Sequence, residues 1–98
     1  MYSENIQQIM DYLEQSDGNL TDEQWSNQSR IAMDILIRMR KHTGPILTDL
    51  RTRNEDYPLA EKLDPAIPHI EVMLEAIQNR DMATAVEHGR AALAALSA

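Results

Sequence analysis

Apolar residues in this chain recur three, four and seven positions apart, the spacing that places side chains on one face of an α-helix. Near the start of the chain this spacing joins Ile6, Ile9, Met10 and Leu13. Strand patterns are scarce, because phenylalanine is missing, valine occurs twice, and no stretch alternates apolar and polar residues over five positions. The pattern predicts an all-α fold.

The length of 98 residues predicts one domain that spans residues 1–98. A chain of this size buries roughly two-thirds of its unfolded surface, enough for one modest core. Cysteine is absent, which excludes disulfides and thiolate metal sites. The first fifteen residues are acidic and contain no base, unlike a signal peptide, and no apolar run has the length of a membrane span. We therefore expect a cytoplasmic protein that does not associate with membranes.

Capping signals mark where the helices begin. Ser3 can cap the first helix, and Thr21 with Gln24 three residues later has the pattern of a capping box. Near the end of the chain, Asn79-Arg80 interrupts the apolar pattern and Asp81 can cap a last helix. These signals predict helix starts close to residues 4, 22 and 82.

The second helix is the most apolar. Trp25, Ala32, Leu36 and Met39 lie within about 40° of one line at 100° per residue. The apolar arc widens to roughly 240° of the circumference when four further residues are added, namely Ile31, Met33, Ile35 and Ile37. A small number of short helices is not enough to cover an apolar arc of this width. We expect Ile31, Met33 or Ile37 to reach the surface and to mark a site for another protein or for a second copy.

Gly44-Pro45 either ends this helix or kinks it, since Gly followed by Pro is a common stop signal. The apolar stripe nevertheless continues in phase, with Ile46 seven residues after Met39. The phase favours one long central helix over about 22–54, kinked at Gly44-Pro45. The predicted architecture is a four- to five-helix up-down bundle.

Residues 55–68 contain Pro58, Pro65 and Pro68, which predicts the main connector of the chain. Pro58 can begin a single turn, and Asp64 can cap a helix whose first residue is Pro65. In the last helix, Gly89 lies between Ala85 and Ala92 on the apolar face. These small residues predict close packing between the last two helices.

Signals for catalysis or metal binding are lacking. His42, His69 and His88 do not have zincin spacing, and no glutamate precedes a histidine by three residues as in di-iron bundles. The chain also has no Gly-x-Ser-x-Gly elbow and no Gly-rich phosphate loop. We therefore predict no catalytic, cofactor-binding or metal-binding residues, although an enzyme built from scattered acids stays open.

Charge is distributed unevenly along the chain, whose net charge is −7. Residues 1–29 and 54–98 are acidic, whereas residues 30–53 hold six bases against two acids. One interpretation is that a basic middle helix pairs with acidic neighbours. The other is a basic patch that binds phosphate or an acidic partner. The acidity argues against nucleic-acid binding and leaves open mimicry of nucleic acid, although the carboxylates are mostly spread singly.

Two functions remain after these exclusions. The favoured hypothesis is a non-catalytic protein that acts by protein–protein interaction, as an adaptor, chaperone or inhibitor. Its candidate interaction residues are Ile31, Met33, Ile37, Arg38, Arg40, Lys41, Arg51 and Arg53. The alternative is a small enzyme or anionic-ligand-binding domain that uses the basic segment 38–53, with His42, Arg40 and Arg51 in its site.

Overall fold

The computed structural model describes the backbone of residues 2–53 and 57–97 and the side chains of residues 2–43 and 62–97. The described residues form four α-helices and no strand. The helices are α1 (Tyr2–Ser16), α2 (Asp22–Arg53), α3 (Tyr57–Gln78) and α4 (Met82–Ser97). This confirms the predicted all-α bundle, with four helices.

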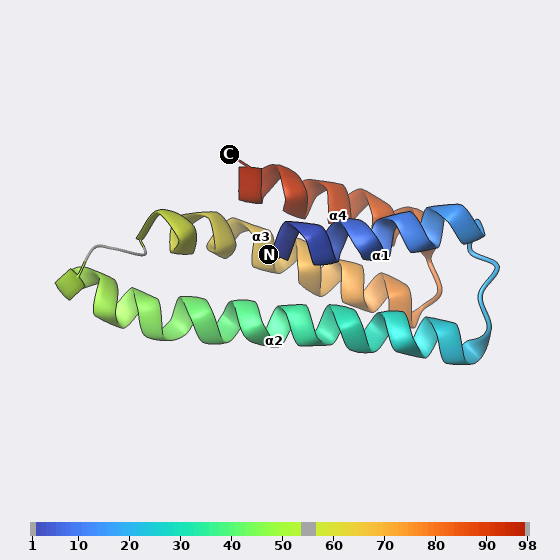
Figure 1. Ribbon diagram of the computed structural model, residues 1–98, viewed down its shortest axis with the longest axis horizontal. Coiled ribbons are helices and arrows are strands. Elements are labelled where there is room, and N and C mark those ends of the chain that lie inside the picture. Colours follow the sequence, from blue (N-terminus) through green and yellow to red (C-terminus); the bar gives the residue numbers. More distant parts are fainter. Residues whose placement is uncertain (1, 54–56, 98) are drawn as a thin grey trace.

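The helices run up and down in chain order, as Figure 1 shows. Each helix packs against the next, and α4 also packs against α1, which closes the bundle into a ring. The contacts of α3 with α4 and with α2 are the most extensive, and the contact between α1 and α2 is the smallest. Every helix therefore has two neighbours.

Helix α2 sets the length of the molecule. Its 32 residues span about 48 Å at the helical rise of 1.5 Å, and the longest dimension of the protein is 48 Å. It continues through Gly44-Pro45, as the phase of its apolar stripe predicted, and ends at Arg53. Helices α1 and α4, with 15 and 16 residues, are half as long. The C-terminal end of α2 and the N-terminal end of α3 thus extend past α1 and α4 (Figure 1).

The predicted connector at residues 55–68 is wrong, because α3 begins at Tyr57 and contains Pro65 and Pro68. Both prolines are exposed, while Leu63, Ala66 and Ile70 on the opposite face are fully buried. An interior proline costs a helix about 3 kcal/mol. Burying a large apolar side chain contributes about 1.5–3 kcal/mol. The buried face of α3 therefore offsets the local cost of its prolines.

Two turns with the same hydrogen-bond pattern, one between α1 and α2 and one between α3 and α4, lie at the same end of the bundle. Asp17 and Arg80 have positive φ angles of 53° and 58° directly after α1 and near the end of α3. In each turn the following residue donates its backbone N–H to a carbonyl five residues earlier, Gly18 to Leu13 and Asp81 to Ala76. These are the bonds of a Schellman motif, which satisfies the last carbonyls of a helix.

Side-chain caps then start the next helices. The capping box of α2 is confirmed, since the Thr21 N–H donates to Gln24 Oε1 at 2.8 Å and the Gln24 N–H donates to Thr21 Oγ1 at 3.2 Å. At α4 the backbone N–H of Thr84 donates to Asp81 Oδ1 at 3.2 Å. Hydrogen bonds from the side chain and the backbone of Thr84 lower the pKa of Asp81 below its ordinary value of 3.8.

Gly89 lets Met10 of α1 approach the backbone of α4 closely. A Cβ atom at this position would lie 2.8 Å from both Cγ and Sδ of Met10, which is 2% exposed. It would also contact Met73 of α3 at 3.4 Å. The small-residue face of α4 therefore accommodates α1 as well as α3, whereas the sequence predicted contact with the preceding helix only.

We predict that the stability difference between the wild type and Asp81→Asn depends on pH. Asparagine keeps the capping oxygen but does not titrate. A lowered pKa in the folded state means that ionised Asp81 contributes stability above 3.8 and loses it as the pH falls through the lower folded pKa. Thermal unfolding at several pH values should show the wild type losing stability relative to the variant in acid. A difference that stays constant with pH would contradict the lowered pKa of Asp81.

Gly89→Ala should destabilise the protein although alanine is the better helix former. The higher helix propensity of alanine alone would raise the free energy of unfolding by at most about 1 kcal/mol. Overpacking against Met10 should lower it by about 1–3 kcal/mol. Denaturant unfolding measures the net effect. In a Met10→Ala background, in which the colliding atoms are absent, the same substitution should become stabilising. An effect of the same sign in both backgrounds would refute the close approach.

Candidate functional site

Large apolar side chains that face solvent are concentrated on α2. In the described part of the chain, three of the five exposed ones lie within seven residues of α2, namely Ile31 at 44%, Met33 at 39% and Ile37 at 43% exposure. The other two are Tyr12 of α1 and Val72 of α3. The exposure predicted for Ile31, Met33 and Ile37 is confirmed, and their role in an interaction stays a prediction.

These residues belong to two edges of α2. Met33 and Ile37 are one turn apart and lie within about 40° of each other around the helix. Ile31 is about 160° away from Met33 by the same arithmetic and lines a groove with Tyr12 of α1. The structure therefore divides the predicted interaction residues, with Met33 and Ile37 on the side of α3 and Ile31 on the side of α1.

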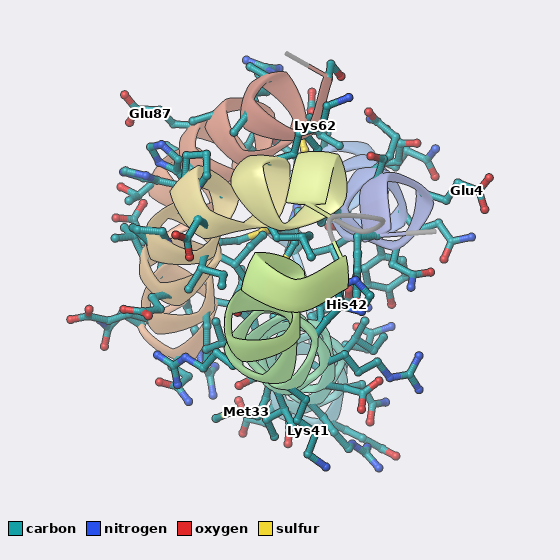
Figure 2. The ribbon with its side chains drawn as sticks, turned by 90° about the vertical axis from the view of Figure 1, so that its left-hand side faces the viewer. Glu4, Met33, Lys41, His42, Lys62 and Glu87 are labelled. Carbon is teal, nitrogen blue, oxygen red and sulfur yellow. The ribbon has the colours of Figure 1, made fainter. Side chains whose placement is uncertain are left out.

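The local sequence explains why Met33 and Ile37 face outward. Trp25, Ala32 and Leu36 occupy the centre of the apolar stripe and are 6%, 0% and 3% exposed. Met33 and Ile37 lie beyond the edge of that stripe, next to the charged strip of α2. Figure 2 shows Met33 and Lys41 directed away from the other helices.

Two arginines of the predicted basic patch are held by carboxylates. Arg38 Nε lies 3.1 Å from Asp34 Oδ2, one turn away on α2. Arg40 Nη2 lies 2.5 Å from Glu71 Oε1 of α3. The Arg40–Glu71 contact supports the interpretation that the basic middle helix pairs with acidic neighbours, whereas the Arg38–Asp34 pair lies within α2 itself. Arg51 and Arg53 were also predicted to belong to this patch, and their side chains lie outside the described residues.

The alternative anion site is not assembled in the described part of the chain. Arg40 and His42 are about 160° apart around α2. Arg40 contacts α3, whereas Figure 2 shows His42 on the side of the bundle where α1 lies. The Nε2 atom of His42 is buried without a hydrogen-bond partner among the described residues. Arg40 and His42 therefore cannot both contact one small anion while they lie on these different sides of α2.

The fold brings together two histidines that lie 19 residues apart in the sequence, on different helices. His69 of α3 and His88 of α4 approach each other with their Nδ1 atoms 3.2 Å apart. They lie at nearly equal distances before and after the Asn79-Arg80 break. In an antiparallel helical hairpin such residues face each other, so this symmetry was the signal that spacing along one helix could not reveal.

Comparison of the chain with protein-family models, with curated proteins and with solved structures found no match. Among the described residues, no helix has the length and apolar character needed to cross a membrane. The functional assignment therefore rests on the surfaces of the bundle.

We predict that Met33→Gln and Ile37→Gln each change the free energy of unfolding by less than about 0.5 kcal/mol, as exposed substitutions usually do. Leu36→Ala, on the buried side of the same turn, should cost about 2–5 kcal/mol because it leaves a cavity. Urea unfolding of the three variants gives the comparison. A large loss for Met33→Gln or Ile37→Gln would place that side chain in the core.

Proposed function

We propose that this protein binds an acidic helix of another protein through the outer face of α2. The outer face is defined by Met33 and Ile37 together with the charged strip beside them, formed by Arg30, Asp34, Arg38 and Lys41. The concentration of exposed apolar side chains on this one helix carries the proposal. Clustered apolar exposure, unlike single scattered residues, is typical of interaction sites.

The shape of the outer face suits a helical partner. Met33, Ile37 and Lys41 follow one another at four-residue intervals, which makes them a ridge along α2. A second helix can place its own side chains on both sides of such a ridge. Met33 and Ile37 would form the buried centre of the contact, and the charged strip would form its rim.

The charge of the outer face favours an acidic partner. The strip holds three bases and one acid, within a chain whose net charge is −7. In a two-fold homodimer this strip would meet itself, because such an interface uses the same patch on both copies. Like charges would then oppose each other, and an acidic helix avoids that repulsion.

Photo-cross-linking tests this proposal. A photoreactive amino acid at the position of Ile37 should cross-link a protein from the native host through an acidic segment. The same amino acid at Val72, exposed on α3, should not capture that protein. Capture should weaken with added salt, because exposed charges are screened.

Two double variants provide the matched comparison. Met33→Gln/Ile37→Gln should abolish capture, and Tyr12→Gln/Ile31→Gln, which removes the apolar pair on the other edge, should retain it. Equal loss in both variants, or cross-links formed mainly between copies of this chain, would overturn the proposal.

A further inference from the structure

His69 and His88 form a contact between α3 and α4 that the proposed function does not use. Their Nδ1 atoms are 3.2 Å apart, and the ring centroids are 5.4 Å apart with a tilt of 34°. Both side chains are half-buried, so the rings are held by packing but remain accessible from solvent. The pair lies on different helices from the outer face of α2.

The separation of the two nitrogens matches that of two ligands on one zinc ion. Zinc binds histidine nitrogens at about 2.0–2.1 Å, and tetrahedral geometry then places two such nitrogens about 3.3 Å apart. To meet at one metal ion, each lone pair would have to point about 35° away from the line that joins the nitrogens, as tetrahedral geometry requires. We propose that His69 and His88 bind a divalent transition metal ion, with Zn²⁺ the ion that fits this separation.

The proton balance of binding follows from the geometry. Without metal, a hydrogen bond between the two Nδ1 atoms of neutral rings requires that one ring carry its proton at Nδ1 and the other at Nε2. Metal coordination needs both Nδ1 atoms unprotonated. The donor ring therefore releases its Nδ1 proton to solvent and takes one up at Nε2, and both rings end as neutral Nε2–H tautomers.

The pair supplies two ligands and leaves the remaining positions open. No group of three or more histidines, aspartates or glutamates in the described part of the chain is placed to hold a metal. The residues one turn away on the two helices lack carboxylate and imidazole groups, being Pro65, Ala66, Val72, Met73, Thr84, Ala85, Ala91 and Ala92. Two water molecules would complete a tetrahedral shell, about one more than at catalytic zinc sites, which have three protein ligands.

Zinc titration of the untagged full-length protein tests this site. Calorimetry should show one ion bound, and NMR should show the ring nitrogens of His69 and His88 shifting while those of His42 stay unchanged. His69→Gln and His88→Gln should each weaken binding more than about tenfold, because loss of even an outer-shell partner commonly costs 10–100-fold. His42→Gln removes the third histidine and should leave binding unchanged.

Absence of zinc binding, or zinc binding that persists in both variants, would overturn the assignment. The NMR measurement on the wild type decides the question independently of whether the variants fold. Shifts confined to carboxylate residues, with both histidine rings unchanged, would also refute it. None of these outcomes bears on the outer face of α2, so this site and the proposed function stand or fall separately.

Discussion

In a ring of four antiparallel helices, each helix contacts two others, and the remainder of its surface faces water. Helix α2 carries apolar side chains around a larger arc than its two neighbours cover, and its contact with α1 is the smallest in the bundle. The core therefore takes Ala32, Leu36 and Met39, while Met33 and Ile37 stay outside. This mismatch between the apolar arc and the available neighbours supports the proposal that α2 has a partner.

The charged side chains form ion pairs at the surface that contribute little to the stability of the fold. Arg40 pairs with Glu71 between α2 and α3, Arg80 pairs with Asp22 across one end of the bundle, and Arg90 approaches Glu14 between α4 and α1. All of these side chains are substantially exposed. Exposed ion pairs contribute about 0–1 kcal/mol each, so burial in the core supplies most of the stability. The Arg40–Glu71 pair joins the basic middle of α2 to an acid of α3, whereas the other two pairs join different parts of the bundle.

The α3–α4 hairpin carries the histidine contact and, on α4, a face of small residues against which α1 packs. Gly89 lacks the side chain that would collide with Met10, and fully buried Ala85 and Ala92 lie one turn to either side of it on α4. On the same hairpin, the turn at Asn79-Arg80 fixes which residues face each other, and His69 meets His88 as a consequence. The register of the hairpin thus determines the geometry of the candidate metal site.

The sequence by itself determined the features that depend on neighbouring residues. The helical class, the capping box at Thr21 and the cap at Asp81 follow from spacings of three to seven residues, and the continuation of α2 followed from the phase of its stripe. The width of that stripe also predicted the exposure of Ile31, Met33 and Ile37. Only the tertiary structure decided how α3 begins, because burial of Leu63, Ala66 and Ile70 against other helices outweighs the local effect of proline. It also placed Ile31 beside Tyr12 of α1 and joined His69 to His88, since these relations depend on which helix lies beside which.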